Sequence, residues 1–370
     1  MKTLRRKTGF IVIACLLLPG CLHKQKIDSP TRVVSMPKSF VSTRPGSSEG
    51  AVFWETSFPS RGLARDTEAL RRDNLELAAA QRRVQQAQRA YDVLRAGLYP
   101  ALDCTAQFDR TRVEDLRERS TTKVIEFGAA LTWEVDVWGR LRAQRKAANL
   151  SIKEKEALFD QIVLDLQCLL IEGWIENQSA RDLGRLLKDQ GETNAKILKL
   201  LELRARKGQS SALDVLQQRG RVASVERMQP AVASARSRSG NAYAVLLGHF
   251  PGEVVPPEDA SPVLMPLNKL PTPQHLLVCR PDLRAAHLAL QAADYEVAAA
   301  VASRMPRLSI GLSYAANGPD LGSVSDGSVM QFVAGMLAPV FAAGRLKAEE
   351  AQRRAEALEM LALLKQALRN

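Results

Sequence analysis

The stretch WEVDVWGRLRAQ (residues 133–144) changes from one hydrophobic period to another halfway along its length. Up to Val135 apolar and polar residues alternate, as in a strand with two different faces, whereas after Gly139 the pattern is charged and alanine-rich, as in a helix. A related stretch, APVFAAGRLKAE, occupies residues 338–349. We therefore predict that the chain makes the same strand-to-helix transition twice.

An internal duplication accounts for this recurrence. RAYDVLRAGLYPAL (89–102) and DYEVAAAVASRMPRL (294–308) each end a helical pattern at a proline and enter a strand pattern. From that proline to the glycine of the transition there are 39 residues in the first half and 38 in the second. Each half is therefore predicted to contain a helix, a strand, a loop, a second strand and a second helix.

The predicted strands are amphipathic. In residues 124–135 bulky apolar side chains alternate with polar or small ones, and the other three strands show the same period. Each run is about ten residues long, which is the length of a tilted strand that crosses a bilayer. A soluble sheet with one wet face is the alternative interpretation. The residues predicted to face lipid are Phe127, Leu131, Trp133, Leu308, Ile310, Leu312 and Phe332.

Four strands cannot close a barrel, and open sheet edges cannot lie in hydrocarbon, where no water satisfies the backbone. We therefore expect several copies of the chain to contribute strands to one barrel. A barrel of about twelve strands would need three copies. The predicted fold class is an α+β membrane protein, with long helices and four membrane strands per chain.

The first half also predicts a very long helical hairpin. There is no proline between Pro100 and Pro230, and apolar residues recur at three- and four-residue spacing after Leu141. At about 1.5 Å per residue, the helix would extend roughly 100 Å. We expect Pro230 to kink the returning helix.

RKGQSSALDVLQ (206–217) predicts the turn at the tip of this hairpin. Gly208 would end the first helix, Ser210 or Ser211 would cap the second, and Asp214 would lie in its first turn.

The N-terminus predicts export and lipidation. A basic start is followed by GFIVIACLLL, an apolar run too short to span a bilayer. It ends in LPGC, which resembles a bacterial lipobox, with Cys21 as the acylated residue and the new N-terminus. Leu22 follows the cysteine in place of Asp, which by resemblance to lipoprotein sorting favours the outer membrane. A plain secretory signal with an incidental cysteine is the alternative.

Composition and motifs argue against other classes. The formal net charge is +12, but Arg alternates with Glu and Asp along the helical patterns, so solvated helix faces are favoured over nucleic-acid binding. The cysteines and histidines show no metal-ligand spacing, and no GxSxG, phosphate loop or GxGxxG is present. We expect neither an enzyme nor a cofactor.

Several stretches together resemble the TolC family of outer-membrane efflux channels, in its NodT- or OprM-like lipoprotein branch. They are LPGC, DNLELAAAQRRVQQA (73–87), WEVDVWGRLRAQRKAA, RKGQSSALDVLQQ, YAVLLG (243–248), CRPDLRAAHLALQAA (279–293), MPRLSI and APVFAAGRLKAEEAQ. The resemblance implies a homotrimer with a twelve-stranded barrel and a periplasmic helical barrel. It also implies docking to a periplasmic adaptor protein and an inner-membrane pump, with Gly208, Ser211 and Asp214 as candidate adaptor contacts.

The expected segments follow one another in order. They are a signal peptide (1–20), a lipidated tether (21–65), a first repeat (66–250), a proline-rich linker (251–280) and a second repeat (281–370). The elements expected after the first helix of the first repeat are strands 102–110 and 124–135, a long helix 139–206 and a return helix 210–247. Those expected in the second repeat are strands 307–316 and 329–340 and a helix 344–370. By symmetry with the first repeat, roughly eighty further residues are expected, so the second repeat is interpreted as incomplete.

We therefore predict an outer-membrane channel of a tripartite efflux system, through which small molecules leave passively. The alternative is a non-conducting, truncated paralogue that acts as a scaffolding outer-membrane lipoprotein. A periplasmic adaptor is disfavoured, because the segments around the hairpin do not predict soluble β-barrel or lipoyl-like domains.

Overall fold

A computed structural model describes residues 60–114, 119–258, 279–324 and 327–369. Its elements are α4 (Arg61–Asp73), α5 (Leu75–Ala96), β1 (Ala101–Glu114), β2 (Arg119–Val135), α6 (Arg140–Arg206), α7 (Ala212–Leu246), α9 (Pro281–Ala302), β3 (Arg307–Gly318), β4 (Gly327–Leu337) and α10 (Arg345–Ala367). None of the described helices combines the length and the apolar character needed to cross a bilayer.

The described chain divides into two compact units. The sheet unit comprises the described residues of 84–157 and 277–370, which hold all four strands together with α9 and α10. The hairpin unit comprises those of 37–83 and 158–276, which hold α4, α7 and most of α6. Helices α5 and α6 continue from one unit into the other.

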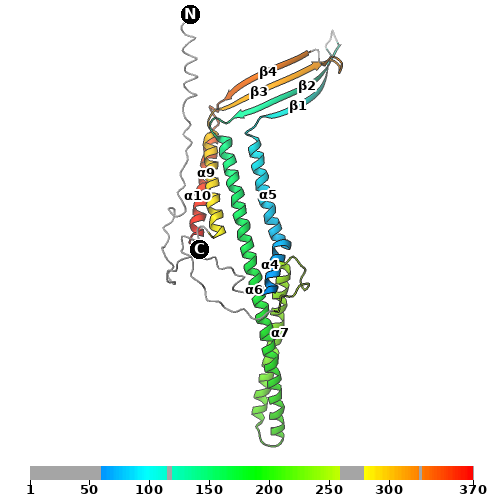
Figure 1. Cartoon of the computed structure of the whole chain (residues 1–370), viewed down its shortest axis with the longest axis vertical. Helices are drawn as coiled ribbons and strands as arrows, with labels where there is room; N and C mark the ends of the chain where they lie inside the picture. The colour runs from blue at the N-terminus through cyan, green and yellow to red at the C-terminus, as the bar shows by residue number, and fades with distance from the viewer. Residues whose placement is uncertain (1–59, 115–118, 259–278, 325–326, 370) are drawn as a thin grey trace. The chain divides into compact units, whose positions relative to one another are not determined.

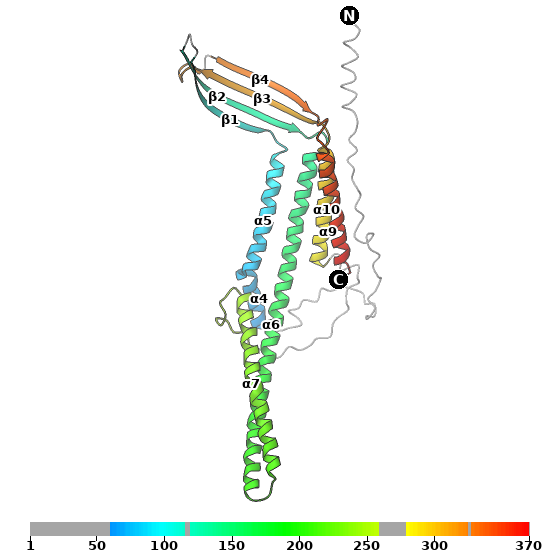
Figure 2. The same cartoon turned by 180° about the vertical axis from the view of Figure 1, so that it is seen from behind.

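The four strands form one antiparallel sheet in the order β1-β2-β3-β4, so neighbours in sequence are neighbours in space (Figures 1 and 2). Strands β1 and β2 extend beyond the predicted ranges 102–110 and 124–135, since β1 ends at Glu114 and β2 begins at Arg119. Their additional residues pair from Arg110 with Lys123 to Glu114 with Arg119. This part of the ladder is polar, so it carries no alternating apolar signal in the sequence.

Strand β3 ends at Gly318, two residues beyond the predicted 316, whereas β4 spans 327–337 and not the predicted 329–340. Pro339 follows two residues after the end of β4. A proline has no N–H to donate to a strand ladder, which accounts for the earlier end.

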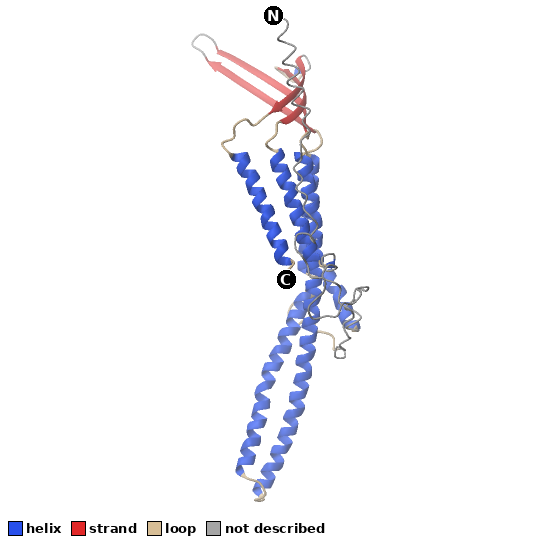
Figure 3. Ribbon diagram, turned by 90° about the vertical axis from the view of Figure 1, so that its left-hand side faces the viewer, coloured by secondary structure: helices blue, strands red, loops and turns tan. Residues whose placement is uncertain are grey.

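The hairpin unit contains two antiparallel helices, the second part of α6 and the whole of α7 (Figure 3). The two helices pack at ordinary side-chain distance, since a Cβ at Gly184 of α6 would lie 3.8 Å from Val232 and one at Gly191 would lie 3.7 Å from Val225. Helix α7 continues through Pro230 as one helix, and the kink expected there stays a prediction. Pro230 is exposed, so water can satisfy the carbonyl that the missing N–H leaves free.

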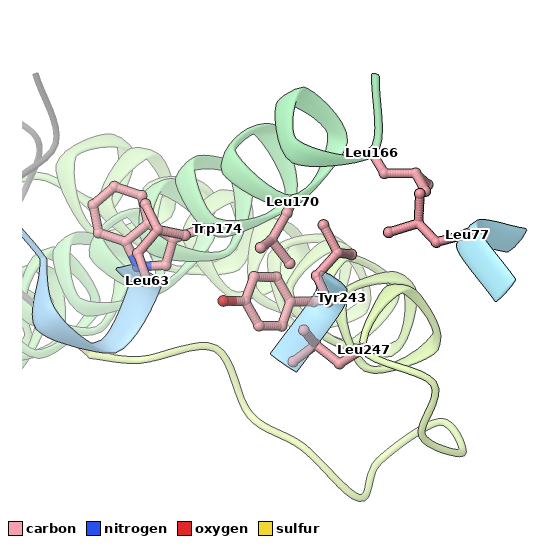
Figure 4. Close-up of a cluster of buried hydrophobic side chains, with 8 residues drawn as sticks. Leu63, Leu77, Leu166, Leu170, Trp174, Tyr243 and Leu247 are labelled. Atoms are coloured by element: carbon pink, nitrogen blue, oxygen red, sulfur yellow. The ribbon is translucent and has the colours of Figure 1, made fainter. Parts of the chain in front are cut away.

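The hydrophobic core of this unit joins α4, α5, α6 and α7 (Figure 4). Its fully buried members include Leu63, Leu70, Leu170, Trp174 and Tyr243. The polar atoms of the two aromatic residues are satisfied, because Trp174 Nε1 donates to the Pro257 carbonyl at 3.1 Å and Tyr243 Oη donates to Asp66 at 2.9 Å. The core explains why α4 is ordered from its first turn.

Helix α4 begins at Arg61, inside the segment 21–65 that we expected to be a tether. The Ser60 hydroxyl accepts the Leu63 N–H at 3.0 Å and caps the helix. The tether prediction was therefore wrong for residues 61–65, and the rest of that segment lies outside the described residues apart from Ser60.

In the sheet unit, α9 and α10 pack against each other. Alanine recurs along α9, which allows the two backbones to come close. A buried carboxylate of α10, Glu350, links the two helices. It forms ion pairs with Arg304, in the segment after α9, and with Arg354 of its own helix, both at 2.7 Å.

Candidate functional site

The sheet has one continuous apolar face. Residues that are paired across an antiparallel ladder point to the same side, and Leu102, Leu131, Leu312 and Phe332 form one such row across all four strands. The next row on this face contains Trp133, Ile310 and Ala334, and a further one contains Val135, Leu308 and Met336. All seven residues predicted to face lipid lie on this face, Phe127 being paired with Ala316.

The opposite face is polar or small over most of its area. Asp103, Ala130, Ser313 and Gln331 form one row, and Gln107, Glu126 and Asn317 form another. Strand β4 departs from this pattern, because Val333 and Leu337 lie on the same face and are 48% and 73% exposed. The sheet thus separates an apolar side from a hydrophilic one, as a membrane barrel requires.

The two outer strands each have a single neighbour within the described sheet. The outer edges of β1 and β4 therefore present unpaired backbone N–H and C=O groups. Such groups are a template for another strand and are not tolerated in hydrocarbon.

The transition at 133–144 shows how the chain turns from β2 into α6. Gly139 has φ 79°, in the left-handed region that a glycine adopts without strain. Asp136 then caps the helix, with its carboxylate accepting the N–H groups of Leu141 at 3.1 Å and Arg142 at 2.9 Å. The Arg140 guanidinium forms an ion pair with the Glu134 carboxylate, with an N–O distance of 2.7 Å.

Two tryptophans connect this transition (residues 133–144, the first corner) to neighbouring segments by hydrogen bonds. Trp133 Nε1 donates to the Leu98 carbonyl at 3.0 Å, and Trp138 Nε1 donates to the Pro306 carbonyl at 2.7 Å. The second bond links the corner of the first repeat to the segment that enters β3. A tryptophan with an apolar ring and a satisfied N–H suits the boundary between lipid and water.

The corner of the second repeat keeps the glycine but not the side chains, and its backbone differs, because Ala343 also has a positive φ, of 46°. Gly344 has φ 83°, close to the value at Gly139, and it is followed by the start of α10. The position of Asp136 is occupied by Phe341, and no side chain caps α10. Arg345, the counterpart of Arg140, pairs with Glu349 of its own helix at 2.6 Å.

The turn at the end of the hairpin brings Gly208, Ser211 and Asp214 together. Gly208 has φ 70°, and Ser211 and Asp214 form a capping box, in which each accepts the other's backbone N–H, at 3.1 and 3.0 Å. Hydrogen bonding from the Ser211 side chain, then from its backbone and from Ser210, lowers the pKa of Asp214. The turn is therefore ordered and carries an exposed negative charge, while its role as an adaptor contact stays a prediction.

The sequence did not identify the residues that hold the first corner. Asp136 lies three residues before Gly139, which is not the spacing of a common capping motif, and the partners of Trp133 and Trp138 are distant in sequence. Cys21, the predicted lipidation site, lies outside the described residues. Among the described residues no group of three or more His, Cys, Asp and Glu side chains is arranged to hold a metal ion.

Comparison with known proteins relates this architecture to a single family. The sequence profile described as "Outer membrane efflux protein" matches residues 67–249 and 272–370. The chain is 28% identical to the pyoverdine export outer membrane protein OpmQ of Pseudomonas putida, covering 83% of this chain and 68% of that protein. It is 23% identical to the "Probable outer membrane lipoprotein SilC" of Salmonella typhimurium, covering 94% of this chain and 76% of that protein.

Solved structures agree on the fold. The described architecture superimposes on a crystal structure of the transmembrane channel CusC with a TM-score of 0.82 at 21% identity, covering 90% of this chain and 77% of that one. The outer-membrane channel OprN gives the same TM-score at 22% identity, covering 91% and 78%.

Proposed function

This chain belongs to the outer membrane efflux protein family, and on that premise we propose that three copies join their sheets into one barrel that serves as a passive exit duct. The family consists of transport channels and not of enzymes. The predictions of family, of an efflux component and of an outer-membrane location are thereby confirmed.

The two-faced sheet with open edges is the observation that supports this proposal. One chain supplies four strands, and three chains would supply about twelve, a number within the range of pore-forming barrels. Pairing β1 of one copy with β4 of the next would satisfy the backbone groups at both edges. The apolar face would then meet lipid, and the face with Asp103, Glu126 and Ser313 would line the lumen.

We further propose that the duct works with a periplasmic adaptor and an inner-membrane pump, which would supply both the cargo and the energy. The ordered turn with Gly208, Ser211 and Asp214 is the candidate contact, since it ends the hairpin in a defined shape with a charged side chain. Related proteins are named for pyoverdine export and for solvent efflux, so the cargo is proposed only as small molecules. Acylation of Cys21 would add a lipid anchor to the barrel.

The proposal is tested by extracting the protein from outer membranes and measuring its mass in detergent, followed by conductance in planar bilayers. A Cys21→Ser variant is included. A channel runs as a trimer, needs detergent with or without the acyl chain, and conducts. A scaffolding lipoprotein would instead become soluble once Cys21 is replaced and would not conduct, which would refute the proposal.

A further inference from the structure

A cleft lies within the hairpin unit, between α6, α7 and the segment 252–258. Its volume is about 720 Å³, and it is lined by one face of each helix and by Val254, Val255 and Pro256. Gly184 of α6 and Gly240 of α7 are among its lining residues. The cleft is separate from the sheet and from the turn at the tip, and no step of the proposed transport uses it.

The charged side chains that line the cleft are predominantly cationic. They are Arg181, Arg185 and Lys188 of α6, Arg236 of α7, and the single carboxylate Glu258. Glu258 is shared, because one of its oxygens lies 3.1 Å from Arg236 and the other lies 3.5 Å from Arg181. Asp182 does not line the cleft but lies 3.5 Å from Arg181 and 3.8 Å from Arg185, so two carboxylates offset four cations.

Arg181 is the most buried of these cations. Its side chain is only 10% exposed, compared with 64% for Arg185 and 45% for Arg236. Its Nε is buried without a hydrogen-bond acceptor, and its ion-pair contacts, to Asp182 and Glu258, are both 3.5 Å long. A buried guanidinium with loose partners is costly, because its desolvation is not offset by close hydrogen bonds.

We propose that this cleft binds an organic anion through a carboxylate or phosphate group that Arg181 and Arg236 hold together. The planar fork of an arginine matches both groups with paired hydrogen bonds, and Lys188 adds a point charge at the rim. The cleft is larger than a single oxyanion needs, so the ligand has an organic part that contacts Val232 and Val255. This inference does not depend on whether the protein conducts.

The test uses the full-length protein in detergent and two probes, citrate and inorganic phosphate, at constant ionic strength set with sodium chloride. Isothermal titration calorimetry is expected to show saturable binding of at least one probe. Binding of citrate alone identifies a carboxylate site, and binding of phosphate alone identifies a phosphate site. The absence of saturable binding of either probe overturns the proposal.

Three variants locate the binding. Arg181→Gln and Arg236→Gln should each weaken it by at least about tenfold, since each removes a charged hydrogen-bond donor. Arg227→Gln is the matched control, because it removes the same charge from an exposed position of α7 outside the cleft. If all three variants weaken binding equally, the effect is general electrostatic attraction and the proposed site is wrong.

The melting temperature of the ligand-free protein shows whether Arg181 has a binding role or a structural one. Arg181→Gln should leave the melting temperature unchanged or raise it, because it removes a loosely paired buried charge. A marked fall would mean that the chain or a neighbouring copy already neutralises this arginine, and that result would also refute the proposal.

Discussion

Placing a charge on the apolar face of the sheet tests the assignment of that face most directly. Leu312 lies in the row that joins all four strands, between Leu131 and Phe332. Ser313 is its neighbour in β3 and points to the opposite face, between Ala130 and Gln331. We expect Leu312→Arg to destabilise the assembled barrel strongly and Ser313→Arg, the matched control, to be tolerated.

The position of Leu312 along β3 sets the expected free-energy cost of the Leu312→Arg substitution. Leu312 is the fifth residue after Arg307, where the strand begins, and at about 3.3 Å per residue this is about 17 Å along the strand. With a tilt of about 35–45°, the depth is about 12–14 Å, roughly the middle of an apolar band about 25 Å tall. An arginine at the midplane costs about 2–4 kcal/mol, which is a change of roughly thirty-fold to several-hundred-fold in the equilibrium constant.

The assay compares the two variants in outer-membrane fractions and in urea unfolding of the detergent-extracted protein. Leu312→Arg should lower both the yield of the assembled form and the urea midpoint, and Leu131→Arg, in the same row, should behave alike. Ala130→Arg should resemble Ser313→Arg. Equal effects on the two faces would show that the apolar row does not face lipid, and that the soluble-sheet interpretation was correct.

Other predictions concern the tip, a glycine and the N-terminus. Because its pKa is lowered in the folded chain, the ionised carboxylate of Asp214 stabilises the turn at pH values above the ordinary carboxylate pKa. This stabilisation is lost as the pH falls through the folded-state pKa. Proteolysis at the tip should therefore increase below about pH 4 in the native chain, and this increase should be absent in Asp214→Asn. Gly248→Ala should lower the melting temperature more than Gly252→Ala, because both positions have positive φ but only at Gly248 would a Cβ lie 2.6 Å from a backbone carbonyl oxygen. Mass spectrometry should find an N-terminal peptide that begins with acylated Cys21, and an unmodified peptide with another start would exclude lipidation there.

The strands and the tip turn were predictable because their signals are local. Alternation over 124–135 specifies which side chains share a face, and Gly208, Ser211 and Asp214 are residues with strong conformational preferences at fixed spacing. The strand ends were less predictable, because the pairing of residues 110–114 with 119–123 depends on the partner strand and not on an apolar pattern.

The corner and the cleft depend on contacts between distant segments. Trp138 meets Pro306 across 168 residues, and no feature of either neighbourhood indicates the other. The cations of the cleft are ordinary helix-surface residues in the sequence, where the alternation of Arg with Glu and Asp favoured solvated helix faces. The structure instead places segment 252–258 beside these helices, with Glu258 3.5 Å from Arg181, whose side chain is buried.

The two corners show what a duplicated segment retains and what it can lose. Both keep a glycine with φ near +80°, because any other residue would strain the backbone there. The cap and the ion pair of the first corner are absent from the second, where Val340 and Phe341 are 95% and 89% exposed. The second corner is therefore held by fewer side-chain contacts than the first, so amide hydrogens there should exchange with solvent before those of the first corner.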